Sequence, residues 1–258
     1  MHHKERESMQ VYKPIGMSCK ELVDEYKDQD EKVAYSGRLD PLAHGMVTLL
    51  FGEQCKLADI YNKRDKTYIF QLIPGVSTDT FDIMGMVTSY NPVTINPQII
   101  CDTFDTIKNN EYQKIPWHSS LVPKERDENG QRHPLWWWAL HSRTSEIEQP
   151  ISKKKLYSIE LETVDTITSD VFFDSIVSRI NKVNSKFTFR QQEILEKWSS
   201  VQFLGTQKGE KQRNDTLLQV FTLKAHVSSG FYIRQLVNDI GEIIGIPCLT
   251  NDIYRPSI

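Results

Sequence analysis

Regular alternation of hydrophobic and polar residues predicts four strands. The clearest run is residues 218–227, where every second residue from Phe221 to Val227 falls on one apolar face. A period of two predicts a strand that is buried on one side. Residues 66–73 and 155–164 predict two further strands, and residues 9–14 predict a fourth.

Helical spacing predicts helices in three places. Residues 169–200 carry apolar side chains at such intervals, and Ser18 followed by Glu21 forms a capping-box pattern that predicts a helix start. The third helix is predicted between Gly230 and Gly245. Its apolar stripe follows the spacing i, i+3, i+4, i+7 and i+11: Ile233, Leu236, Val237, Ile240 and Ile244.

Strand and helix signals follow one another without an internal repeat. We therefore predict a mixed fold with one continuous sheet and helices on its faces. Two connections, residues 116–143 and 207–215, are polar, charged or interrupted by proline and are predicted as loops.

The composition is that of an ordinary globular protein. The chain has 258 residues, 31 Lys+Arg against 34 Asp+Glu, and a formal charge of −3. No apolar run approaches the roughly 20 residues of a membrane-spanning helix, and residues 1–10 lack the apolar core of a signal peptide. We expect an intracellular protein of the cytoplasm or nucleus. The small negative charge counts against nucleic-acid binding on composition alone.

The four cysteines, at positions 19, 55, 101 and 248, have neither the spacing of a zinc site nor that of a disulfide framework. We expect free thiols and no metal site.

Asp40 is the first candidate for chemistry. It precedes Pro41, which restricts its backbone, and Gly37 and Gly45 bracket the loop. A carboxylate held in this way could act as a nucleophile, a general base or a metal ligand. An ordinary Asp-Pro turn accounts for the same residues.

Arg234 and Tyr68 are further candidates. Arg234 falls in the first turn of the predicted helix, off its apolar stripe, where a guanidinium and a helix N-terminus could bind an anion. A solvated arginine is the alternative. Tyr68 shares a face of its predicted strand with Phe70 and Leu72, so it could equally be a core residue.

Three motifs together resemble the TruB-type tRNA pseudouridine synthases. They occur in the family's order and at about its separations: GRLDPLAHG (37–45), KTYIFQLIPGVSTDTFD (66–82) and SSGFYIRQLVNDIG (228–241). Residues 11–18 (VYKPIGMS) and 113–120 (QKIPWHSS) are similar to two more family segments. The resemblance spans roughly residues 10 to 255 and implies an α+β fold of the pseudouridine synthase type, with a mainly antiparallel sheet.

The resemblance also implies the activity and the site. These enzymes detach a uracil from its ribose and rejoin it through carbon, without a cofactor. Asp40 matches the family nucleophile, Tyr68 the tyrosine that stacks on the base, and Arg234 the arginine that orients the aspartate. Three positions match the family's substrate-binding residues: Tyr232, Lys13 and Ile253.

Several segments depart from the family pattern. Tyr35 stands where the family often has a histidine near the base-flipping site. Residues 114–145 match a loop that grips the RNA and carry basic residues beside Trp136, Trp137 and Trp138. We expect one or two of these tryptophans in the core and the remainder near RNA. Residues 165–215 form a predicted insertion with its own helices.

We therefore expect a single catalytic domain over residues 1–258, without a C-terminal PUA domain. Its predicted partner is tRNA, at the T arm, with other stem-loop RNAs as further candidates, and its predicted state is a monomer. Two alternatives remain: an RNA-binding or tRNA-folding protein without catalysis, and a hydrolase that uses Asp40 on another N-glycoside. In each RNA-binding case a local positive cleft should surround Asp40 and Arg234. The runs 153–155 and 208–213 are candidate phosphate contacts.

Overall fold

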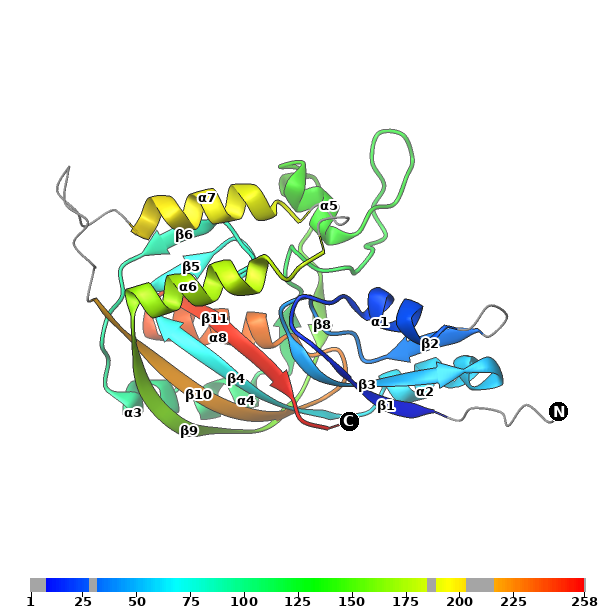
Figure 1. Cartoon of the computed structure of the whole chain (residues 1–258), viewed down its shortest axis with the longest axis horizontal. Helices are drawn as coiled ribbons and strands as arrows, with labels where there is room; N and C mark the ends of the chain where they lie inside the picture. The colour runs from blue at the N-terminus through cyan, green and yellow to red at the C-terminus, as the bar shows by residue number, and fades with distance from the viewer. Residues whose placement is uncertain (1–7, 28–31, 185–188, 203–215, 258) are drawn as a thin grey trace.

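Seven strands form the main sheet. The computed structural model describes residues 8–27, 32–184, 189–202 and 216–257 (Figure 1). Strands follow one another in the order β1, β3, β11, β4, β10, β9, and β2 also pairs with β3. All neighbours are antiparallel except β3 and β11. The bounds are β1 (Met9–Lys13), β2 (Val33–Ser36), β3 (His44–Phe51), β4 (Lys66–Pro74), β9 (Leu156–Thr168), β10 (Leu217–Val227) and β11 (Cys248–Arg255).

These strands confirm the predicted mainly antiparallel sheet, but the expectation of one continuous sheet is wrong. Two separate two-stranded sheets accompany it in the described residues. One joins β5 (Val76–Thr78) to β6 (Val87–Tyr90), and the other joins β7 (Tyr112–Lys114) to β8 (Ile151–Lys153). Their strands are only three or four residues long, so the sequence carries little periodicity there.

Strand alternation supplies a hydrophobic core on each face of the main sheet. In β10, Phe221 and Leu223 belong to the cluster under α8 (Ile233–Ile244), whereas Leu218 and Val220 belong to the cluster with α6 (Ser169–Ile180) and α7 (Gln191–Gln202). Figure 1 shows α6 and α7 together on one side of the sheet, with α8 behind it. Helices therefore cover both faces of the sheet, as predicted.

Capping and spacing set the helices that position the site. Helix α1 (Cys19–Tyr26) begins at the predicted capping box: Ser18 Oγ accepts from the Glu21 amide, and the Glu21 carboxylate accepts from the Ser18 amide. Helix α8 ends at Gly245, which has a left-handed φ of 68°. The remaining helical segments are η1 (Gly52–Leu57), α2 (Ala58–Asn62), α3 (Pro97–Cys101), α4 (Phe104–Asn109), α5 (Leu135–Leu140) and η2 (Thr144–Glu146).

Helix α5 corrects the prediction that residues 116–143 form only a loop. It begins after Pro134, whose restricted backbone suits a helix start, and it buries Leu135 and Trp138. These side chains form a small third cluster with Ile115 and Ile147.

The four cysteines are free thiols, as expected. Among the described residues, no helix is both long and apolar enough to span a bilayer.

Candidate active site

Asp40 lies in the connection between β2 and β3, and several contacts fix that connection. The Pro41 carbonyl accepts from the Gly16 amide at 2.8 Å, and the Asp40 carbonyl accepts from the Ala43 amide at 3.1 Å. Gly45 has φ 120°, and a Cβ atom there would lie 2.1 Å from the Arg255 carbonyl oxygen. A glycine is therefore required where this loop joins β3.

Arg234 donates to Asp40 from the first turn of α8. The distance from Arg234 Nε to Asp40 Oδ2 is 2.8 Å. The Arg234 side chain is only 5% exposed, whereas that of Asp40 is 39% exposed. The two side chains therefore pair directly, and the alternative of a solvated Arg234 is wrong, while their joint role in the reaction stays a prediction. Arg234 thus holds a carboxylate that remains accessible in part to solvent.

The remaining Arg234 nitrogens are also satisfied. Nη1 donates to the Thr80 carbonyl at 2.8 Å, and Nη2 donates to the His118 carbonyl at 3.1 Å. A second carboxylate, Asp82, lies 3.6 Å from Nε and is 14% exposed. Burial alone would lower the pKa of Arg234, but Asp40 and Asp82 together raise it above its ordinary value. The guanidinium therefore stays charged.

Asp82 is a site residue that the sequence reasoning did not single out. Its Oδ1 accepts from Thr80 Oγ1 at 2.7 Å and from the Met84 amide at 2.9 Å. Burial raises the pKa of this carboxyl, and the charge of Arg234 opposes that rise. The only sequence signal was its place at the end of the motif 66–82.

Tyr68 lies on β4 and reaches the same cleft. Its ring is 8% exposed, and its hydroxyl accepts from Arg255 Nη1 at 3.3 Å. Arg255 is fully buried and also donates to the Gly37 and Met46 carbonyls at 2.7 and 2.8 Å. A single arginine of β11 therefore ties the Tyr68 hydroxyl to both ends of the Asp40 loop.

Asp40, Tyr68 and Arg234 line one cleft of about 630 Å³, together with Tyr35, Tyr232 and Ile253. Tyr35 is held by Arg38, which donates to its hydroxyl from Nε at 3.0 Å and from Nη2 at 2.7 Å. Tyr232 precedes α8, and Gln113 bonds both its backbone amide and its carbonyl. Burial raises the pKa of the Tyr232 hydroxyl, so it stays neutral.

The cleft is basic. Within the described part of the chain, two carboxylates line it, Asp40 and Asp59. The cations that line it are Arg38, Lys63, Lys66, Lys154, Arg234 and Arg255. The expected local positive cleft is therefore present in a chain of net charge −3.

Lys13 does not reach the cleft, which corrects its predicted contact with substrate. It is fully buried, and its ammonium donates to the carbonyls of Pro14, Met17 and Pro41 at 2.9, 2.7 and 3.2 Å. Lys13 therefore stabilises the Asp40 loop, because its ammonium donates to the carbonyl of Pro41, the residue directly after Asp40.

Burial lowers the pKa of Lys13 from 10.5 to about 8. Between those two values the unfolded chain holds a proton that the folded chain has released, so stability should rise with pH in this window. We expect the unfolding free energy of the protein, measured relative to Lys13→Met by urea denaturation, to increase by up to about 3 kcal/mol from pH 8 to 10.5. A constant difference over that window would contradict a buried, desolvated ammonium.

The segment 114–145 borders the cleft through Ser119 and Ser120. Trp138 is 1% exposed, and Trp136 is 43% exposed. Trp137 stacks between two histidine rings, with centroid distances of 3.8 and 4.2 Å to His133 and His141. One tryptophan is thus in a core, as expected. Contact of this segment with RNA stays a prediction.

Of the basic runs, Lys154 lines the cleft, and Lys153 instead pairs with Glu111 at 2.8 Å. Residues 208–213 lie outside the described part of the chain. No group of three or more His, Cys, Asp or Glu side chains suited to a metal ion occurs among the described residues.

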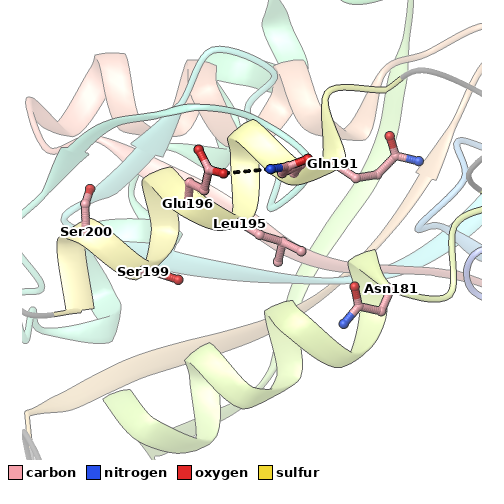
Figure 2. A pocket seen from close by; sticks show the side chains of 7 residues that line it. Asn181, Gln191, Leu195, Glu196, Ser199 and Ser200 are labelled. Atoms are coloured by element: carbon pink, nitrogen blue, oxygen red, sulfur yellow. Dashed lines mark hydrogen bonds between the residues drawn. The ribbon is translucent and has the colours of Figure 1, made fainter.

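A second hollow, of about 650 Å³, lies beside α7 and the end of α6 (Figure 2). Gln192 donates to Glu196 there at 3.0 Å. Of the described residues that line it, none lines the Asp40 cleft and none is an arginine or a lysine. We assign no part of the site to it. The lining residues are Asn181, Gln191, Gln192, Leu195, Glu196, Ser199 and Ser200.

The chain is similar in sequence to proteins named tRNA pseudouridine synthase B. The tRNA pseudouridine synthase B of Caldicellulosiruptor saccharolyticus is 33% identical over 152 residues, which cover 58% of this chain and 50% of that protein. That of Tolumonas auensis is 26% identical over 235 residues, 90% of this chain and 54% of the relative. That of Blochmanniella pennsylvanica is 27% identical over 248 residues, which cover 95% of this chain and 72% of the relative. The chain spans about half the length of the first two.

Solved structures confirm the pseudouridine synthase-like fold. A chain of the archaeal box H/ACA sRNP Nop10–Cbf5 complex has a TM-score of 0.51 at 12% identity, covering 98% of this chain and 48% of its own. A chain of a Cbf5–Nop10–Gar1 complex has a TM-score of 0.50 at 14% identity, and the match covers 96% of this chain and 47% of that one. Likeness at such low identity concerns the fold alone. A family model described as TruB family pseudouridylate synthase, N-terminal domain, matches residues 25–179, more than half of the sequence. The chain belongs to the TruB family of pseudouridylate synthases.

Proposed function

We propose that the protein isomerises uridine to pseudouridine in tRNA, with a uridine of the TψC loop as its target and Asp40 as its nucleophile. The observation that carries this proposal is the 2.8 Å pairing of Asp40 with Arg234 in a basic cleft. The Arg234 side chain is 5% exposed and stays charged, so a fixed positive charge lies beside the Asp40 carboxylate.

The chemistry needs few groups. An Asp40 oxygen attacks the nucleoside covalently while the C1′–N1 glycosidic bond breaks. The detached uracil turns, C5 bonds to C1′ as the bond between C1′ and Asp40 breaks and frees the carboxylate, the proton leaves C5, and N1 gains one. In this scheme Tyr68, which lines the cleft and accepts from Arg255, stacks on the turning base and takes part in proton transfer. Electrons balance without an oxidant or reductant.

The substrate class follows from the cleft and from the relatives. The cations Arg38, Lys63 and Lys154 line the cleft and suit phosphate groups, since RNA affinity depends on such contacts. A uridine in a loop must be turned out of its stack before Asp40 can reach it, and aromatic residues such as Tyr35 and Tyr232 compensate that cost by stacking.

The test uses an unmodified tRNA transcript and maps pseudouridine after incubation with the full chain. We expect conversion of one T-loop uridine, with no release of free base. A folded protein that binds the transcript but forms no product would favour the RNA-binding alternative. Release of uracil would favour the hydrolase.

A further inference from the structure

Arg234 depends on two backbone carbonyls that belong to different segments. Thr80 lies in the turn between β5 and β6, and His118 lies in the segment after β7. Both carbonyls accept from the Arg234 guanidinium, at 2.8 and 3.1 Å. The direction of Arg234 Nε toward Asp40 is therefore set by how these two segments are held together.

Asp79 and His118 join the two segments directly. His118 Nδ1 lies 3.0 Å from the Asp79 carbonyl, and because a carbonyl can only accept, Nδ1 carries the proton. The other ring nitrogen, Nε2, is then an acceptor. Burial lowers the pKa of His118, which agrees with a neutral ring.

Arg190 closes this arrangement from the start of α7. Its Nη2 lies 2.9 Å from Asp79 Oδ2 and 3.4 Å from His118 Nε2, so one nitrogen donates to both partners. The side chains of Arg190, Asp79 and His118 are 24%, 27% and 15% exposed. An ion pair shielded from water to this degree contributes more to stability than a pair on the surface does.

The backbone shows that these contacts hold a conformation that is costly by itself. Phe81, directly after Thr80, has φ 65°, and Arg190 has φ 58°. Non-glycine residues adopt such values at a cost of about 1–2 kcal/mol and keep them only where the surroundings fix them. Arg190 is one of the two strained residues, and its partner Asp79 lies two positions before the other, Phe81.

We propose that Arg190 is a positioning residue for the reaction. By holding Asp79 and the neutral ring of His118 together, its guanidinium fixes the Thr80 and His118 carbonyls that aim Arg234 at Asp40. Arg190, which lies within the predicted insertion 165–215, thereby contributes to the geometry of the site without lining the cleft. This inference rests on the proposed function.

The kinetic test compares Arg190→Met, Arg190→Lys and Arg179→Met with the unaltered protein, on a tRNA transcript. Arg179 is the matched control, because it lies on α6 and pairs with Asp252 at 2.9 Å but contacts neither carbonyl partner of Arg234. For Arg190→Met we expect kcat to fall about 10- to 100-fold, the scale of a small displacement of reacting groups, with KM within about threefold. Arg190→Lys should restore part of kcat, and Arg179→Met should keep it. An unchanged kcat, or a loss that lysine does not restore, overturns the proposal.

A second measurement needs no catalysis. The buried Arg234 Nε–H should give a slowly exchanging NMR signal in the unaltered protein and in Arg179→Met. In Arg190→Met it should shift and exchange faster, while thermal unfolding shows that the variant remains folded. An unaltered Arg234 signal in Arg190→Met overturns the positioning role. Failure of the unaltered protein to form pseudouridine would instead overturn the proposed function, and the NMR comparison would still decide the role of Arg190.

Discussion

Asp40→Asn is expected to lower the rate of pseudouridine formation by at least about 1,000-fold, because a neutral amide cannot replace the attacking carboxylate. Asparagine has nearly the same shape, and its side-chain oxygen can still accept from Arg234 Nε, which now donates at 2.8 Å. Binding of the tRNA transcript should therefore change by less than about threefold. Single-turnover rates and filter binding measure the two quantities separately.

Asp59→Asn is the matched control for this result. Asp59 is the other carboxylate that lines the cleft, so its substitution removes the same charge from the same field. If both variants lose activity equally, the effect of Asp40 is electrostatic rather than nucleophilic. If Asp40→Asn loses binding as strongly as it loses activity, Asp40 is a structural residue and the proposed chemistry is wrong.

Arg234→Met is expected to abolish the reaction and to destabilise the fold by about 3–5 kcal/mol. The reason is the group that it leaves behind: Asp82 is 14% exposed and loses the guanidinium 3.6 Å away, so it must either remain as an unpaired buried charge or take up a proton. The Thr80 and His118 carbonyls would also lose their donors. Urea denaturation at pH 7 measures the change in unfolding free energy.

The double variant Arg234→Met/Asp82→Asn separates stability from catalysis. Asparagine removes the unpaired charge while its oxygen can still accept from Thr80 and Met84. We expect the double variant to recover at least half of the lost stability and none of the activity. Equal stability of the single and double variants would show that Asp82 does not depend on Arg234.

Local patterns predicted some of the elements that position the site, but not β2, β3 or β11, which flank the Asp40 loop and carry Arg255. Strands β4 and β10 and helix α8 each follow from a clear period, and the cap at Ser18 follows from two residues three positions apart. Neighbouring residues carry these signals, because the period of the apolar positions along the chain decides which side chains face the core. The short strands β5 to β8 were missed since three or four residues carry no period.

The fine geometry of the site depends on contacts between distant parts of the chain. Lys13 was predicted at the substrate, yet it binds the Pro41 carbonyl, 28 positions away. Asp82 and Arg234 are 152 positions apart, and Arg190 and Asp79 are 111 apart. Residue type shows that such groups carry charge, but only the fold shows whether another residue satisfies that charge or a substrate must do so.

The place of β11 in the sheet has a consequence for synthesis of the protein. This strand lies between β3 and β4, and Arg255 bonds the Met46 carbonyl from 209 positions further along the chain. At about 5–20 residues per second, a ribosome needs roughly 10–40 s to make the intervening chain. During that time the Asp40 loop lacks the arginine that ties it to Tyr68. The edges of β3 and β4 that pair with β11 also have no partner strand. A nascent chain should therefore be inactive on RNA until residue 255 has left the ribosome.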